Sequence, residues 1–115
     1  MQYALFIRDS SMHGEALPSA LRFAAAAVAR GHRIRLVFFH GDAVWAVAQP
    51  DASGYPALDR LVALARAEGF PLLACQAAVE RLGATVAGDA PLRMGSLGQW
   101  ADVLFEVDRV MEFCA

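Results

Sequence analysis

Strand-like and helix-like segments alternate along almost the whole chain, and this alternation restricts the folds that the sequence can adopt. The expected strands are residues 3–8, 32–42, 70–75 and 109–114, and the expected helices are residues 16–31, 57–69, 76–83 and 97–108. Strands that are separated by helices pair in parallel, with the helices packed on the faces of the sheet. The pattern therefore predicts an α/β sandwich with a mainly parallel sheet and right-handed crossovers.

Two of the expected helices have clear boundary signals, a proline near the start and a glycine at the end. These are Pro18 and Gly31 in the first helix, and Pro56 and Gly69 in the second. A proline is tolerated in the first turn of a helix, and glycine is the usual C-terminal stop. Two other stretches have no clear period. We expect a loop with one helical turn in residues 41–56 and weak structure in residues 84–96.

The composition excludes some function classes. The chain has 115 residues, enough for one domain, and 57% of them are hydrophobic while 19% are charged. This apolar content predicts that part of the surface lies in an oligomer interface. Ten basic residues face twelve acidic ones, so the net charge is -2 and the chain offers no basic field for direct binding of nucleic acid.

The sequence shows no signal for a membrane or for export. Its uncharged stretches fall far short of the roughly 20 residues that span a bilayer. The start, MQYALFIRDS, lacks the basic segment and the long apolar run of a signal peptide. We therefore expect a cytoplasmic protein that does not bind membranes.

Cysteines and histidines are few and scattered. The two cysteines, Cys75 and Cys114, form neither a disulfide framework nor a C-x-x-C pair, and both are expected to be reduced in a cytoplasm. His13, His32 and His40 show no metal-ligand spacing with them. We expect no metal and no organic cofactor.

In an open parallel sheet, function gathers at the carboxyl ends of the strands, where the strand order switches. Residues 8–14, residues 40–45 and Cys75 each follow a strand and would meet at that edge. If the strand order is flavodoxin-like, the first and third strands are neighbours. His13 would then come close to Cys75 and could assist a thiolate, although a solvated loop histidine fits the sequence better.

Cys75 stands where an apolar strand ends and a helix begins, in the stretch PLLACQAAVERLG. Free backbone N–H groups and the helix dipole favour a thiolate at such a position. A thiolate is the nucleophile in sulfur transfer and in thiol exchange. Free cysteine is also among the most buried residue types, so position alone leaves a buried, inert side chain open. Cys114, the penultimate residue, is interpreted as an inert or incidental thiol.

The remaining candidates have ordinary structural explanations beside functional ones. His40 and Asp42 could form a polar pair at the sheet edge, but a turn explains the HGD sequence equally well. We interpret Trp45 and Trp100 as packing anchors in the core or in an interface, rather than as platforms on which a ligand stacks. The loop RDSSMHG lacks the glycine pattern of a phosphate loop, which argues against a nucleotide or flavin site.

Several stretches, taken together and in order, resemble one protein family. VFFHGDAVW is similar to a VFFY-x-(D/E)-G-V-Y segment, and CQAAVERLG is similar to a C-x-A-A-x-x-R-G segment. The ending GSLGQWADVLFEVDRVMEF is similar to S-G-L-G-x-L-A-E-x-x-x-x-x-D-R-V-V-x-F. These segments are typical of the DsrE/TusD proteins of bacterial sulfur relay, and the similarity covers most of the chain.

The resemblance implies a fold, an activity and partners. It implies a single-domain, flavodoxin-like three-layer sandwich with about five strands, in a trimer-based or hexameric assembly of DsrE-type subunits, homomeric or heteromeric. The cysteine of the C-x-A-A segment, here Cys75, would accept sulfur as a persulfide from a donor. It would pass the sulfur to a partner such as a TusE/DsrC-like protein. The relay would serve 2-thiouridine formation in tRNA or sulfur oxidation.

The chain departs from the family pattern in four places. The first loop, residues 8–19, differs from the usual G-P-x-Y-G type, and residues 51–58 are compressed. The segment between Cys75 and Ser96 is short, and Cys114 extends past the usual aromatic end. Because the shortened segment follows the proposed site, the chain could instead be a non-catalytic assembly subunit with a buried, inert Cys75. A small-ligand or flavin-binding module is a third, weaker alternative.

Overall fold

The structure is a computed structural model that describes residues 1–8, 15–47, 56–86 and 91–114. The strands are β1 (Gln2–Ile7), β2 (Arg33–Phe39), β3 (Leu72–Cys75), β4 (Leu92–Gly95) and β5 (Arg109–Phe113). The helices are α1 (Ala16–Ala29), α2 (Val44–Val47), α3 (Pro56–Glu68), α4 (Gln76–Leu82) and α5 (Leu97–Leu104), with a 3-10 turn η1 (Gly41–Ala43) before α2. In this part of the chain, no helix is long and apolar enough to cross a lipid bilayer.

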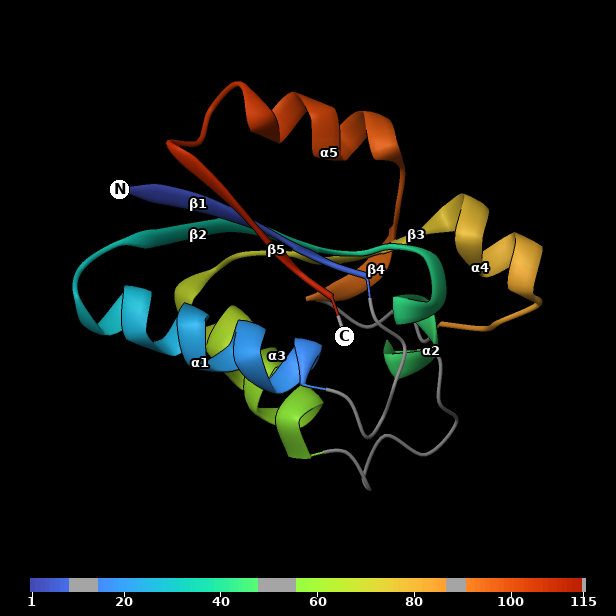
Figure 1. Cartoon of the computed structure of the whole chain (residues 1–115), viewed down its shortest axis with the longest axis horizontal. Helices are drawn as coiled ribbons and strands as arrows, with labels where there is room; N and C mark the ends of the chain where they lie inside the picture. Colours follow the sequence, from blue (N-terminus) through green and yellow to red (C-terminus); the bar gives the residue numbers. More distant parts are fainter. Residues whose placement is uncertain (9–14, 48–55, 87–90, 115) are drawn as a thin grey trace.

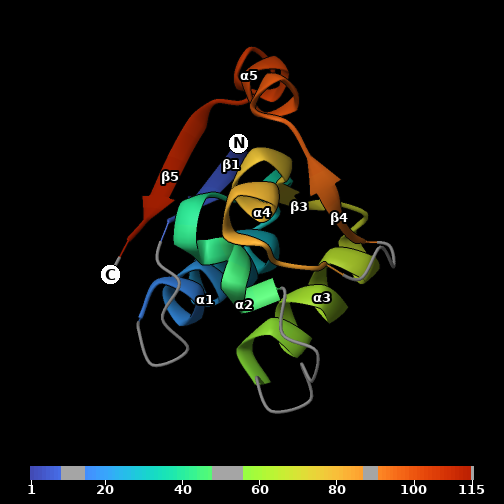
Figure 2. The same ribbon diagram turned by 90° about the vertical axis from the view of Figure 1, so that its right-hand side faces the viewer.

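The strands form one parallel sheet in the order β4-β3-β2-β1-β5. Helices α1 and α3 cover one face of the sheet and α5 lies over the other face (Figure 1). Helix α4 stands beyond the carboxyl ends of the strands, as Figure 2 shows from that edge. The predicted three-layer α/β sandwich with a parallel sheet of about five strands is confirmed.

The expectation that the first and third strands would be neighbours is wrong. β1 pairs with β2 on one side and with β5 on the other, so β2 separates β1 from β3. The first four strands are added one after another in a single direction, which is the common arrangement for consecutive elements. The proposed proximity of His13 to Cys75 depended on the other order, and His13 itself lies outside the described residues.

The boundaries of α1 and α3 match the sequence signals, whereas α5 ends at Leu104 instead of residue 108 and β4 is a strand that the sequence does not predict. Helix α1 has Pro18 in its first turn, and Gly31, with φ of 82°, follows its end. Residues 84–96 were expected to be weakly structured, yet they contain β4. This strand has only four residues and lies at an edge of the sheet, and Met94 is largely exposed. Its sequence therefore lacks the apolar run that marks a covered strand.

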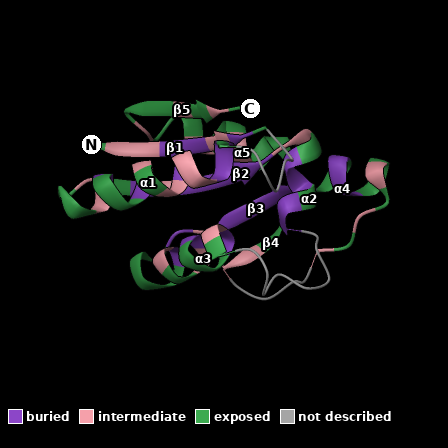
Figure 3. Ribbon diagram, turned by 60° about the horizontal axis from the view of Figure 1, so that its bottom comes forward, coloured by how far each residue is buried: buried purple, intermediate pink, exposed green. Residues whose placement is uncertain are grey.

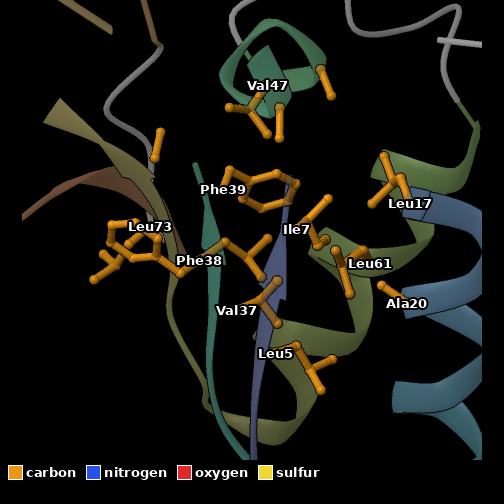
Figure 4. Close-up of a cluster of buried hydrophobic side chains, with 14 of the residues drawn as sticks. Leu5, Ile7, Leu17, Ala20, Val37, Phe38, Phe39, Val47, Leu61 and Leu73 are labelled. Atoms are coloured by element: carbon orange, nitrogen blue, oxygen red, sulfur yellow. The ribbon is translucent and has the colours of Figure 1, made fainter. Parts of the chain in front are cut away.

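The core lies around the two central strands and is thicker on the side of α1 and α3. The purple buried residues in Figure 3 concentrate on β2 and β3. Figure 4 shows Phe38 and Leu73 on one side of these strands, while Leu5, Val37 and Phe39 are on the other. All five side chains are buried.

Helix α5 packs on the core through two half-buried side chains, Trp100 and Val103. None of its residues is fully buried. The half-buried ring of Trp100 packs against Phe6 and Phe38, with ring centroids 4.9 and 5.8 Å apart. The prediction of a packing anchor is therefore confirmed for Trp100. Trp45, in α2, is 36% exposed.

Candidate functional site

Cys75 is the last residue of β3 and the residue on which α4 begins. β3 is buried over its whole length, so the strand delivers Cys75 to the edge of the core. Gly83 closes α4 in the left-handed conformation with φ of 68°, which makes α4 a short helix. Cys75 is paired in register with Gly95, the last residue of β4. The cysteine thus lies at the carboxyl edge of the sheet, where the sequence placed it.

A pocket of about 280 Å³ opens beside Cys75 at this edge. At the carboxyl ends of the strands, β3 continues into α4. β4 continues into α5, which lies over the face of the sheet opposite α1 and α3. The pocket is lined by Cys75, Gln76, Ala77, Glu80, Ser96 and Leu97.

Cys75 lines this pocket although the residue is only 2% exposed. Gln76 and Glu80 form a polar wall of the pocket, and the side-chain amide of Gln76 donates a 3.2 Å hydrogen bond to the Glu80 carboxylate. Leu97 forms an apolar wall, and this residue is 49% exposed.

The start of α5 is fixed next to Cys75 by a capping box. The Ser96 hydroxyl accepts a 3.2 Å hydrogen bond from the Gln99 backbone N–H. The Gln99 side-chain oxygen accepts a 2.7 Å bond from the Ser96 backbone N–H. Gly95 leaves room for this arrangement, since a Cβ there would come within 2.7 Å of the Leu73 side chain and 2.8 Å of the Gln99 oxygen. The position of Ser96 in the pocket wall therefore depends on its hydrogen bonds with Gln99 and on the absence of a side chain at Gly95.

Replacement of Ser96 by alanine is expected to destabilise the protein by about 1 kcal/mol, because a helix cap of this kind typically contributes that much. The lost hydroxyl leaves the Gln99 N–H without its cap. Urea denaturation of Ser96→Ala against wild type measures the change. Ser19→Ala, which removes a hydroxyl that accepts a 3.1 Å bond from Arg22 on exposed α1 surface, is the matched control. It should change stability by less than about 0.5 kcal/mol. Equal effects of the two substitutions would contradict the capping role.

His40 lies at the carboxyl edge of the sheet, where the sequence placed it. It directly follows β2, and its ring packs against Phe6, with centroids 5.3 Å apart. The pKa of His40 is lowered, first by burial and then by the positive charges of Arg8 and Arg81. The HGD sequence had pointed only to a turn or to a pair with Asp42. The turn is present, because the Ala43 N–H bonds to the His40 carbonyl oxygen.

The other candidates lie away from Cys75 or outside the described residues. Cys114 is exposed and follows β5, which is separated from β3 by two strands. His32 lies before β2, at the opposite edge of the sheet, and its Nδ1 is 2.9 Å from the N-terminal amine. Within the described ranges, no cluster of three or more His, Cys, Asp or Glu residues could hold a metal ion. Of the thiols, Cys75 alone lines the pocket at the carboxyl ends of β3 and β4.

Comparisons with known proteins agree with the motifs. The DsrE/DsrF-like family matches residues 1–113. A DsrE protein of Allochromatium vinosum is 29% identical, over 98% of this chain and 98% of the relative. A sulfurtransferase TusD homolog of Pseudomonas aeruginosa is 30% identical, over 98% of this chain and 97% of the relative. Both alignments run over 128 residues, more than this chain has, so both relatives carry segments that it lacks.

The fold has a counterpart among solved structures. The crystal structure of the YchN protein from E. coli superposes with a TM-score of 0.76 and 23% sequence identity. The superposition covers 98% of this chain and all of the other. With a family match that extends from the first residue to the end of β5, the chain belongs to the DsrE/DsrF-like family.

Proposed function

We propose that this chain is a sulfur-relay protein that carries sulfur as a persulfide on Cys75. The observation that carries the proposal is the position of Cys75, which lines the pocket at the carboxyl ends of β3 and β4. The curated relatives support it, since they are named as sulfurtransferases of the DsrE and TusD type. The cysteine also stands in the C-x-A-A segment of the chain, with Ala77 and Ala78 following it.

The chemistry requires one thiol and two partners. The Cys75 thiolate attacks the outer sulfur of a donor persulfide, the donor S–S bond breaks, and the donor leaves as a thiol. In the second step, an acceptor thiolate attacks the outer sulfur on Cys75 and leaves Cys75 as a thiol. Neither step needs an external oxidant or reductant. We propose that the acceptor is a TusE/DsrC-like protein and that the relay serves tRNA 2-thiouridine formation or sulfur oxidation in the cytoplasm.

We also propose that the chain works in an oligomer of DsrE-type subunits. Several large apolar side chains are exposed on α5 and on the two edge strands beside it. They are Met94, Leu97, Leu104, Phe105 and Val110. Leu97, Leu104 and Phe105, on α5 or directly after it, are the part of this set that we propose for a subunit interface. Because Leu97 also lines the pocket, a neighbouring subunit there would lie close to Cys75.

Sulfur loading tests the proposal. The protein is incubated with a low-molecular-weight persulfide, or with a cysteine desulfurase and cysteine, and its intact mass is measured. Wild type and Cys114→Ser should each gain the mass of one sulfur atom, and Cys75→Ser should gain none. Cys114→Ser is the matched control, because it removes the other thiol while Cys75 and its pocket stay intact. Loading that persists in Cys75→Ser would exclude Cys75 as the carrier.

A second candidate function follows from the burial of Cys75. At 2% exposure the thiol could be inert, and the chain would then be a non-catalytic assembly subunit that contributes its apolar surface. Alkylation of the native Cys114→Ser protein separates the two functions. A Cys75 that reacts at neutral pH without denaturant supports the carrier. A Cys75 that reacts only after unfolding supports the assembly subunit.

A further inference from the structure

His40 and Cys75 end two neighbouring strands at the same level of the sheet. β2 and β3 are paired in parallel up to Phe39 and Ala74. The next residue on each strand is His40 on one side and Cys75 on the other. His40 keeps an extended backbone, with φ of −121° and ψ of 150°. Since neighbouring strands lie about 4.8 Å apart, the two residues are separated by roughly one strand spacing.

The side chains of these two residues point to the same face. Phe38 is opposite Leu73 in the register, and paired residues of parallel strands project to the same side. Figure 4 shows both side chains on the face away from Leu5 and Phe39. Because side chains alternate along a strand, the residues two positions on, His40 and Cys75, return to that face.

The aromatic contacts of His40 agree with this placement. Its ring stacks near that of Phe38, with centroids 6.4 Å apart and planes 26° apart. Trp100 of α5 packs on the same Phe38 ring at 5.8 Å, which identifies the face as the one under α5. Ser96 and Leu97, at the start of α5, line the pocket of Cys75. The register therefore places His40 and Cys75 on neighbouring strands, at the same edge and on the face of the sheet that α5 covers.

The charges around His40 keep its ring neutral. Burial lowers its pKa most, and Arg8 after β1 and Arg81 on α4 lower it further. Arg8 is paired with Glu112 of β5 through a 2.7 Å bond, and the thiol of Cys114 lies near the same guanidinium. A histidine with a pKa below its usual value of 6.5 has a free ring nitrogen at neutral pH.

We propose that His40 accepts the proton of the Cys75 thiol during sulfur transfer, an inference that rests on the proposed persulfide function. As the Cys75 sulfur attacks the donor persulfide, its proton moves to the free ring nitrogen of His40. The donor S–S bond breaks and the proton passes from His40 to the departing donor sulfur. Cys75 ends as a persulfide, the donor ends as a thiol, and His40 is again neutral. The hydrogen bond between Cys75 and His40 would form when the substrate binds, since catalytic hydrogen bonds are often long or absent before that step.

The sign of the pH dependence follows from the state of the ring. Below the pKa of His40 the imidazolium has no lone pair, so loading slows. Because that pKa is lowered, wild type should retain its loading rate at more acidic pH than an ordinary histidine would allow. Without the histidine, the thiol must lose its proton to water or hydroxide, and the rate should fall steeply from alkaline pH downward.

The test compares pH profiles of loading in proteins that all carry Cys114→Ser, from about pH 5 to pH 10. His40→Phe keeps a ring on Phe6 and Phe38 but removes the base, and His40→Gln keeps a polar group. Both should load about 100-fold more slowly than the parent at pH 7, the scale of general base catalysis, and approach it at the alkaline end. His32→Gln, at the other edge of the sheet, is the matched control and should keep the parent profile.

Superimposable profiles for His40→Phe and its parent would overturn the inference, because packing alone would then explain His40. The urea midpoint of each variant shows that it is folded. A second readout separates this inference from the function on which it rests. Alkylation of Cys75 by iodoacetamide needs no persulfide. If the parent never gains sulfur, the proposed persulfide function fails. In that case, an alkylation profile that shifts to alkaline pH in both His40 variants would still show that His40 accepts the Cys75 proton.

Discussion

Replacement of Phe39 by alanine is expected to destabilise the protein by about 3–5 kcal/mol. Phe39 is fully buried on the face of the sheet that α1 and α3 cover, and Figure 4 shows its ring between Ile7 and Val47. Truncation removes a large apolar group from water-free surroundings and leaves a cavity that rigid strands cannot close. Stabilities of small domains are about 5–15 kcal/mol, so a large part of the total would be lost.

Phe105→Ala is the matched control for this experiment. It makes the same chemical change at a side chain that is 91% exposed. At protein concentrations at which the chain is monomeric, the free energy of unfolding of Phe105→Ala in urea should stay within about 0.5 kcal/mol of wild type. If the two substitutions cost the same, Phe39 does not occupy the core position that the structure gives it.

Replacement of Trp100 by alanine is expected to destabilise the protein by about 2–3 kcal/mol. This is less than for a fully buried aromatic side chain, because the ring is only half-buried. The main effect of the substitution should be local. Helix α5 has no fully buried residue, and Trp100 contacts both Phe6 and Phe38. Without this anchor, α5 should detach from the sheet more often than the rest of the protein unfolds.

Hydrogen exchange of residues 97–104 measures that local opening. In Trp100→Ala, the amide protons of α5 should exchange much faster, while those of β2 keep their relative protection. Leu104→Ala, a truncation on the same helix at a side chain that is 38% exposed, should leave α5 protected. Uniform loss of protection across the sheet in Trp100→Ala would contradict the role of a local anchor. Detachment of α5 should also disrupt the Cys75 pocket, because Ser96 and Leu97 at the start of α5 line it.

Much of the fold could be predicted because its signals are local. Pro18 and Gly31 mark the limits of α1, and the apolar run that ends at Cys75 marks β3. The strand order could not be predicted in this way, because the periodicity of a strand indicates which face is buried but not which strand lies beside it. β4 escaped prediction for a related reason: Arg93 and Met94 are exposed at the edge of the sheet, so the strand has no apolar pattern.

The site could be predicted only in part. Cys75 was recognised from its place between strand and helix and from the family segment around it. Ser96 could not be connected with it, because only the pairing of β3 with β4 brings the two together. The proximity of His13 to Cys75 would require β1 to lie next to β3. In the observed order the neighbour of β3 is β2, the strand that His40 follows.

The most direct test of the account locates the sulfur itself. Wild-type protein is loaded from a persulfide, trapped with an alkylating agent and digested, and its peptides are sequenced by mass spectrometry. The account predicts that the added sulfur is on the peptide that contains Cys75, while the peptide that contains Cys114 carries only the alkyl group. Added sulfur on Cys114 alone, or on neither cysteine, would contradict the assignment of Cys75 as the sulfur carrier.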